Sequence, residues 1–355
     1  MEGKRIIFLP IWGKQNETIP QKQMEAIRDL GGFARYGLPV TLFPLIRSAI
    51  AFRPDVISLD WIHQYAVSPG WFASLVKSFF FAIDVVLVQL IFKPKMVWTM
   101  HNLQHHDPRP RKIERWISKF FASKCSFIRV LGPGIEAVVA EYLELPKSKI
   151  ISIPEGPFVG WYPDDVAAAQ ARIKLKLDPA DRVWLYFGNL RPYKGVEQLI
   201  GAFKNLAKPN SRLIIAGRPF DNHYAQSLKD LCLQMPDVVL DFRTIPDDEI
   251  QVFFAASDLV VLPFKNVLNS GSAILAMGFS KPVVAPAIGL LPFRLKSQPD
   301  LLYRQNEKLE DALIRSEKFD NEALAEFGRK NREEVLQYKW EDFAKFLLKI
   351  ASNGE

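Results

Sequence analysis

The chain has 355 residues, of which 48% are apolar and 24% charged, and its formal net charge is +7. This composition is ordinary for a soluble globular enzyme, and the length favours two domains because single cores rarely exceed about 250–300 residues. The first apolar run, residues 6–12, is too short for a signal-peptide core, which argues against export.

The first half alternates short apolar runs with helical patterns, which predicts a parallel sheet covered by helices on both faces. A breaker-rich stretch at residues 154–163 predicts the boundary between two domains. We expect an N-terminal domain over 1–157, a second domain over 158–335, and a C-terminal helix at 336–355 that returns to the first domain. The expected strands of the first half are 5–12, 55–59, 96–100, 126–131 and 150–153, and the expected helices are 22–36, 71–92, 113–123 and 134–143.

The second half repeats this rhythm and predicts a second parallel sheet. Its last part, residues 321–350, is expected to be helical. The expected strands are 183–187, 212–216, 238–242, 259–262 and 282–285, and the helices between them are 196–206, 223–234, 247–256 and 272–279.

The segment 71–92 is apolar over about the length needed to cross a bilayer. Lys77 and Asp84 interrupt it, and strands are predicted on both sides. We therefore expect a buried helix between strands, and a partly exposed helix that touches a bilayer remains the alternative.

The excess positive charge lies in the first half. Residues 1–163 carry 20 Lys and Arg against 13 Asp and Glu, whereas residues 164–355 are neutral. Such a patch suits an anionic membrane, an anionic lipid-linked substrate or nucleic acid, and the alternative is a solvated helix face. Nucleic acid is the weakest option, because Trp116, Phe120 and Phe121 have the spacing of a core stripe. The densest part comprises Arg109, Arg111, Lys112, Arg115, Lys119, Lys124 and Arg129.

Residues 187–195, FGNLRPYKG, are the most informative stretch. They join a predicted strand to a predicted helix, and they contain Gly188, Arg191 and Lys194. Backbone N–H groups at a helix N-terminus attract anions, and nearby cations reinforce this attraction. The stretch therefore predicts a phosphate-binding turn.

A second turn of this type, Asn269-Ser270-Gly271-Ser272, opens the helix expected at 272–279. By itself it is more typical of a helix cap than of a site. Two such turns at the carboxyl ends of strands in one domain favour a ligand, because open α/β sheets bind ligands there. Arg218 and Arg243 end two further strands and would extend the rim, although each alone is more typical of a surface ion pair.

Polar side chains also end two strands of the first half. His101 and Asn102 follow one strand, and Asp60 follows the preceding one. The short run that includes His105, His106 and Asp107 fits no standard zinc spacing, and Cys125 and Cys232 are far apart in sequence without metal-ligand spacing. We therefore expect a polar active-site loop without a metal, and the cysteines favour a reducing compartment.

Together these motifs resemble the GT-B glycosyltransferases, specifically the large retaining group called family 4. The likeness rests on residues 187–200, on the strand and loop 258–264, on 278–286, and on Met100-His101-Asn102. The resemblance implies two Rossmann-like domains whose parallel sheets face a cleft, with the acceptor bound by the first domain and a UDP- or GDP-linked sugar by the second, and no further cofactor.

The resemblance also implies roles for individual residues. Arg191 and Lys194 would neutralise the donor diphosphate, the amides at 270–272 would bind it, and His101 would contact the transferring sugar. Many members carry an arginine directly after the first glycine, where this chain has Asn189. Many also carry two glutamates, at the positions that correspond to Val267 and Leu275. An inverting enzyme would need a general base, for which Asp60, His106 or Asp107 could serve.

The sequence thus predicts a cytoplasmic enzyme that transfers a hexosyl group from a nucleotide sugar to a lipid-linked or polysaccharide acceptor, with retention, at the inner face of a membrane. Two alternatives stay open: an epimerase-like enzyme on the same fold, and a non-catalytic partner subunit. Loss of the glutamates disfavours the epimerase and is compatible with the partner subunit.

Overall fold

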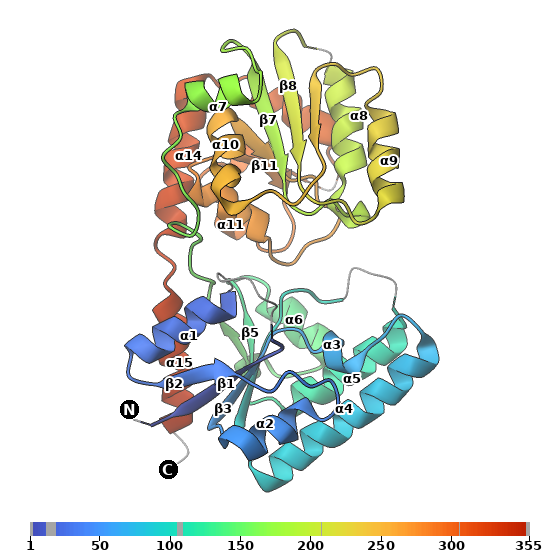
Figure 1. Cartoon of the computed structure of the whole chain (residues 1–355), viewed down its shortest axis with the longest axis vertical. Coiled ribbons are helices and arrows are strands. Elements are labelled where there is room, and N and C mark those ends of the chain that lie inside the picture. Colours follow the sequence, from blue (N-terminus) through green and yellow to red (C-terminus); the bar gives the residue numbers. More distant parts are fainter. Residues whose placement is uncertain (1–2, 12–18, 105–108, 207, 305, 353–355) are drawn as a thin grey trace. The chain divides into compact units, whose positions relative to one another are not determined.

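The chain folds into two compact α/β units (Figure 1). The computed structural model describes residues 3–11, 19–104, 109–206, 208–304 and 306–352. One unit comprises Met1–Glu155 and Lys339–Glu355, and the other comprises Gly156–Tyr338. We call them the N-terminal and C-terminal units.

The N-terminal unit contains a six-stranded parallel sheet in the order β2-β1-β3-β4-β5-β6. Helices α1 and α15 contact one another, and both contribute to a core with Ile6, Val56 and Val97. The strands are β1 (Arg5–Leu9), β2 (Phe33–Tyr36), β3 (Val56–Leu59), β4 (Lys95–Thr99), β5 (Phe127–Val130) and β6 (Ile150–Ser152). The helices are α1 (Ile19–Asp29), α2 (Pro44–Phe52), α3 (His63–Ala66), α4 (Trp71–Ile91), α5 (Arg111–Lys124), α6 (Glu136–Leu143) and α15 (Trp340–Ser352).

The C-terminal unit contains a second six-stranded parallel sheet, in the order β12-β11-β10-β7-β8-β9. Its strands are β7 (Arg182–Phe187), β8 (Ser211–Ala216), β9 (Val238–Asp241), β10 (Leu259–Val261), β11 (Val283–Pro286) and β12 (Leu302–Tyr303). Its helices are α7 (Ala168–Lys174), α8 (Val196–Leu206), α9 (Asn222–Leu231), α10 (Asp247–Ala256), α11 (Gly271–Gly278), α12 (Leu291–Arg294), α13 (Leu309–Ser316) and α14 (Asn321–Val335).

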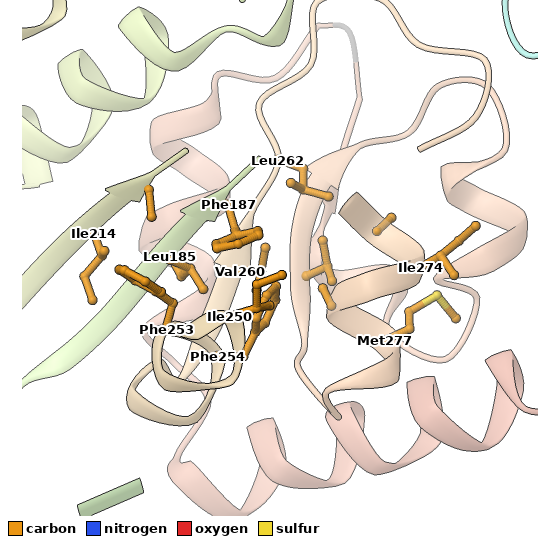
Figure 2. Packing of buried hydrophobic residues seen from close by; sticks show 14 of the residues in the cluster. Leu185, Phe187, Ile214, Ile250, Phe253, Phe254, Val260, Leu262, Ile274 and Met277 are labelled. Atoms are coloured by element: carbon orange, nitrogen blue, oxygen red, sulfur yellow. The ribbon is translucent and has the colours of Figure 1, made fainter. Parts of the chain in front are cut away.

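Strand β7 is anchored in hydrophobic cores on both faces. Trp184 and Tyr186 are fully buried on the side of α8, whereas Leu185 and Phe187 pack on the side of α10 and α11. Figure 2 shows this second cluster, in which the ring of Phe187 lies 5.1 Å from that of Phe254. Because Phe187 directly precedes Gly188, this packing fixes the start of the predicted phosphate turn.

The predicted parallel sheets are confirmed, but one predicted helix is wrong. The helix expected at 22–36 ends at Asp29, and Phe33–Tyr36 forms β2. Gly31 has a φ of +81°, and a Cβ on Gly32 would lie 2.7 Å from Ile27 and Leu348, so the two glycines end the helix and let the chain pass close to α15. The short elements α2, α3, α7, α12, α13 and β12 were not predicted.

Arg129 does not contribute to a basic surface, contrary to expectation. Its side chain is buried and donates hydrogen bonds of 2.9 Å from Nε to Ile153 O and from Nη2 to Pro154 O. The guanidinium carbon also lies 3.8 Å from the ring centroid of Phe343 in α15. Arg129 thus joins the end of β6 to the C-terminal helix.

Helix α4 lies between β3 and β4 as predicted, but only one of its faces is buried. Ser74, Ser78 and Asp84 face the protein, and Asp84 accepts hydrogen bonds of 2.8 Å from the N–H groups of Leu45 and Ile46 at the start of α2. Burial raises the pKa of Asp84 to about 6, although these two hydrogen bonds lower it. The opposite face exposes large apolar side chains, namely Trp71, Phe72, Leu75, Val76, Phe79, Phe80, Val86, Leu90 and Ile91.

Candidate functional site

The four predicted strand ends of the C-terminal unit lie next to one another, in the order β10-β7-β8-β9. The chain runs outward from β7 to β8 and β9, and then crosses back to β10 on the other side of β7. The order therefore reverses between β7 and β10. Parallel sheets bind ligands at such a switch point, at the carboxyl ends of the strands. The two predicted anion-binding turns follow these two strands.

The turn after β7 is held against the turn after β8 by backbone contacts. Gly188 N donates a hydrogen bond of 3.0 Å to Ala216 O, and Leu190 N donates one of 2.8 Å to Arg218 O. Gly188 has a φ of +129° and Gly217 one of +142°, and a Cβ on Gly217 would lie 2.1 Å from Gly188 O. Both positions therefore require glycine.

Two predicted residues, Lys194 and Ser272, converge beside Gly188. A Cβ at this position would lie 2.9 Å from Ser272 Oγ and 3.6 Å from Lys194 Nζ. A hydroxyl, an ammonium group and an exposed stretch of backbone thus surround a space that is open because position 188 has no side chain. We call this arrangement the cradle. Its donors and its positive charge suit an oxyanion such as a phosphate.

Lys194 carries its charge in a partly buried place. It ends the short 3-10 helix Pro192–Lys194, and the following Gly195 has a φ of +73° and packs against the carbonyl of Pro263. Burial, together with the positive charge of Arg191, lowers the pKa of Lys194 from 10.5 to about 8. An anion in the cradle would relieve both effects.

The three arginines predicted to bind the donor at the strand ends have different surroundings. The guanidinium of Arg191 lies 4.9 Å from the ring centroid of Phe220, which holds it beside the turn. Arg218 is exposed. Arg243 donates hydrogen bonds to Asp241 and to Glu249, so carboxylates compensate its charge. Arg243 thus has the surface ion pairs that were the alternative to a donor contact.

The turn before α11 is both a helix cap and part of the cradle. Ser270 Oγ accepts a hydrogen bond of 3.2 Å from Ala273 N, which is an N-cap contact, whereas Ser272 faces Gly188. Asn269 Oδ1 accepts a hydrogen bond of 3.3 Å from Nε of the fully buried Arg294. The ring of Phe158 lies 3.7 Å from the position of a Cβ on Gly271.

Arg294 and Phe158 were not found from the sequence. Arg294 lies in a helix that was not predicted, and Phe158 lies in the stretch interpreted as a linker. Nothing in the local pattern of either residue connects it with residues 269–271.

The positions of the missing glutamates are part of the core. Val267 is buried, and Leu275 is partly buried and packs against the same cluster. A carboxylate at either position would lose solvation there unless it were paired. The substitutions are therefore accommodated by the packing around α11.

In the N-terminal unit, His101 lies between two buried carboxylates. Its Nε2 is 3.7 Å from Asp60 Oδ1, and its Nδ1 is 3.8 Å from Glu155 Oε1. The imidazole stacks on Trp61 with ring centroids 4.6 Å apart. Asp60 Oδ1 and His101 Nε2 are buried without a hydrogen bond to any residue that the structure describes, and both residues line a small pocket. Buried polar atoms of this kind usually have a ligand or water as partner.

Glu155 was missed because it lies far from His101 in the sequence, in the predicted linker. The signal was its place shortly after β6, which ends at Ser152, at the carboxyl edge of the sheet that also holds Asp60 and His101. His105, His106 and Asp107 lie outside the described residues. Among the described residues no group of three or more His, Cys, Asp or Glu side chains is placed to hold a metal.

Comparison with known proteins supports the family. Residues 168–333 match the family model described as glycosyl transferases group 1. Sucrose-phosphate synthase from Thermosynechococcus elongatus superimposes with a TM-score of 0.76 at 18% identity, covering 99% of each chain. HepE from Anabaena, solved in complex with UDP-glucose, superimposes with a TM-score of 0.74 at 16% identity over 99% of this chain and 100% of that one. The chain has the GT-B fold, and its residues 168–333 match the glycosyl transferases group 1 family.

Two curated relatives within this family align over part of their length. The GDP-mannose:glycolipid 4-beta-D-mannosyltransferase of Xanthomonas campestris is 28% identical over 68% of this chain and 64% of the relative. The D-inositol 3-phosphate glycosyltransferase of Segniliparus rotundus is 28% identical over 59% of this chain and 48% of the relative. This GT-B chain thus spans less than two thirds of either relative.

The cradle predicts that Gly188→Ala abolishes nucleotide binding. The new methyl group would occupy the space beside Ser272 Oγ, and the positive φ would add strain of about 1–3 kcal/mol. We expect at least a tenfold loss of affinity for UDP-glucose and for GDP-mannose, measured by isothermal titration calorimetry. Gly134→Ala is the matched control, because Gly134 has a φ of +94° but no atom within 4 Å of a Cβ. Equal nucleotide affinity in the two variants would contradict the cradle.

Proposed function

We propose that this GT-B chain transfers a hexosyl group from a nucleotide-diphosphate sugar to a lipid-linked or polysaccharide acceptor. The observation that carries the proposal is the convergence of Lys194 Nζ and Ser272 Oγ on the open space beside Gly188. The fold adds that this space lies at the switch point of the sheet. A diphosphate is the ligand that best matches a partly buried cation and two backbone turns.

The same groups can act in the reaction. When the glycosidic bond to the diphosphate breaks, negative charge grows on the leaving phosphate. Lys194 and Arg191, together with the amides at the start of α11, are fixed before the reaction and would stabilise that charge. The cradle therefore would bind the donor and also favour its departure.

The proposed donor is a nucleotide sugar whose base is uracil or guanine, as in UDP- and GDP-linked sugars. HepE is solved with UDP-glucose, and the Xanthomonas relative is named for GDP-mannose. Both names support a nucleotide-diphosphate hexose, and neither selects the base for this chain.

His101 and Asp60 are proposed to contact the transferring sugar and the acceptor. Their unsatisfied buried atoms, Nε2 and Oδ1, could bond to sugar hydroxyls. The resemblance to family 4 favours retention. Asp60 and Glu155 nevertheless supply buried carboxylates, and the Xanthomonas relative is named a 4-beta-D-mannosyltransferase, so inversion by a general base is the second candidate. The anomeric configuration of the product, read by NMR, separates the two.

A lipid-linked acceptor is supported by helix α4. Its fully buried side chains include Ser74, Ser78 and Asp84, whereas Phe72 is 73% exposed and Trp71 63% exposed. A helix that exposes so many large apolar side chains on one face suits a nonpolar environment there. By length and composition α4 could also cross a membrane, a property that core helices of soluble proteins share.

The neighbouring helix α5 adds positive charge to this surface. It packs against α4 (Figure 1), and its exposed side chains include Arg111, Lys112, Arg115 and Trp116. Cations beside exposed aromatic side chains favour an anionic lipid surface. We therefore propose that the N-terminal unit docks on the inner face of a membrane, from which it would reach a lipid-linked acceptor.

A non-catalytic partner subunit remains the second candidate for the whole chain. Val267 and Leu275 are apolar and packed in the core, so the positions that are acidic in many relatives cannot supply carboxylates here. Donor binding without turnover on any acceptor membrane would favour this candidate.

The pKa of Lys194 predicts how donor affinity depends on pH. Only the protonated lysine attracts the diphosphate, and the bound anion raises its pKa again. Affinity for UDP-glucose or GDP-mannose, whichever binds, should be constant below about pH 7 and fall by up to tenfold per unit above the free pKa of about 8. Calorimetric titration of the full chain across this range measures the effect.

Two variants test that assignment. Lys194→Met should bind the donor at least tenfold more weakly at pH 7. Its affinity should also lack the part of the decrease above about pH 8 that is due to the lysine, so any decrease that is left reflects ionisation of the nucleotide base. Lys204→Met, on the exposed face of α8, is the control and should behave as the wild type. If Lys194→Met bound the donor with the affinity and the pH profile of the wild type, Lys194 would be excluded from the donor site.

The exposed face of α4 predicts membrane binding that depends on its aromatic residues. The double variant Phe72→Ser/Phe79→Ser should lose at least tenfold in affinity for anionic vesicles in a sedimentation assay, because each large apolar side chain contributes about 1.5–3 kcal/mol when buried. Leu233→Ser in the C-terminal unit is the control, since Leu233 is 79% exposed. Vesicle binding that is absent in the wild type or unchanged in the double variant would contradict the proposal.

A further inference from the structure

A second cavity in the C-terminal unit is separate from the cradle. It has a volume of about 590 Å³, which is within the range of small-molecule sites. Helix α8 and the start of α13 form its walls, and the segments after β10, β11 and β12 form its floor. Gly188, Lys194 and Ser272 do not line it.

Neither the backbone conformation nor the packing of the described residues requires glycine at position 201, which lines this cavity. It lies in the middle of α8, where glycine costs about 1 kcal/mol relative to alanine. A Cβ there would have no heavy atom within 4 Å, and the backbone has no positive φ that would require glycine. The missing side chain therefore relieves no steric conflict in the described chain, and its one visible effect is to keep the wall of the cavity open.

The rim of the cavity is positively charged. Lys265, Arg304 and Lys308 are exposed, and their side chains make no ion pair with any residue that the structure describes. The rim also holds two carboxylates, which are fewer than the three cations. Glu307 lies 3.6 Å from Arg315 Nη1 and accepts a hydrogen bond of 2.7 Å from the N–H of Arg304, and Glu310 accepts one from Asn205. The rim can therefore attract an anion.

Part of the lining is apolar and aromatic. Phe264, Ile288 and Tyr303 form this part, and burial raises the pKa of the Tyr303 hydroxyl, which stays neutral and able to donate a hydrogen bond. Gln198 adds an amide on the wall. Aromatic surface with a few polar groups suits a ring that has an apolar face and hydroxyls at its edge, such as a pyranose.

We infer that this cavity binds a small phosphorylated sugar, with the sugar ring on Phe264 and Tyr303 and the phosphate at Lys265, Arg304 and Lys308. The inference does not depend on the identity of the donor. The site is nevertheless close to the cradle, because Lys265 N donates a hydrogen bond of 3.0 Å to Tyr193 O, in the turn that carries Lys194.

The test uses the full chain and glucose 6-phosphate as the probe, with glucose and inorganic phosphate as partial probes, in isothermal titration calorimetry. Gly201→Leu should abolish binding of glucose 6-phosphate, because the new side chain fills the cavity, while the thermal midpoint is kept or raised. Lys308→Gln and Arg304→Gln should each weaken binding by about tenfold. Lys204→Leu on the same helix and Lys318→Gln near α13 are the matched controls and should bind as the wild type.

Lys194→Met separates this cavity from the donor site. We expect it to bind glucose 6-phosphate normally, and we expect Gly201→Leu to bind the nucleotide normally. Loss of glucose 6-phosphate binding in Lys194→Met but not in Gly201→Leu would place the probe in the cradle and overturn the inference. Absence of binding to the wild type would also overturn it. So would binding of phosphatidylglycerol vesicles that Gly201→Leu abolishes, because the occupant would then be a lipid headgroup.

Discussion

The contact between the backbones of Gly188 and Gly217 is the constraint on which the C-terminal unit depends. It brings the end of β8 so close to Gly188 that position 217 cannot carry a Cβ, and both glycines adopt a positive φ. Phe187 holds one side of this contact in the core, and Leu190, fully buried, holds the other. Hydrophobic packing thus fixes a turn whose function would lie in the space that the missing side chains leave open.

The same backbone contact also determines where the positive charges of the turn lie. The turn that begins at Gly188 brings Arg191 and Lys194 together, and the crossover to β10 brings Ser272 to the same place. Lys194 loses solvation and lies near a like charge, which lowers its pKa. A protein that keeps a cation in such a place forgoes stability unless an anion joins it. A ligand-binding role explains this arrangement better than a purely structural one.

The sequence was sufficient where the pattern is local. Glycine between a strand and a helix, followed by two cations, predicted the turn at 187–195, and alternating apolar runs predicted two parallel sheets. It was insufficient where partners are distant in the chain. Glu155 and Arg294 contact site residues that only the fold brings near, and the charge of Arg129 gave no sign that Ile153 and Phe343 would bury it.

Helix α4 shows a different limit. Its composition predicted a long apolar helix, but nearly all of its faces are apolar, so the pattern could not indicate which face would be buried. The buried face carries the three polar side chains Ser74, Ser78 and Asp84, which form hydrogen bonds with the protein, as well as apolar side chains such as Val85. In the predicted α1, by contrast, Gly31 and Gly32 ended a helix that hydrophobic periodicity alone would have continued.

A crystal structure of the chain with a bound nucleotide sugar would test the central claim most directly. The account predicts the diphosphate over Gly188, with phosphate oxygens within hydrogen-bonding distance of Lys194 Nζ and Ser272 Oγ. A diphosphate bound elsewhere on the C-terminal unit, with the space beside Gly188 empty, would contradict it.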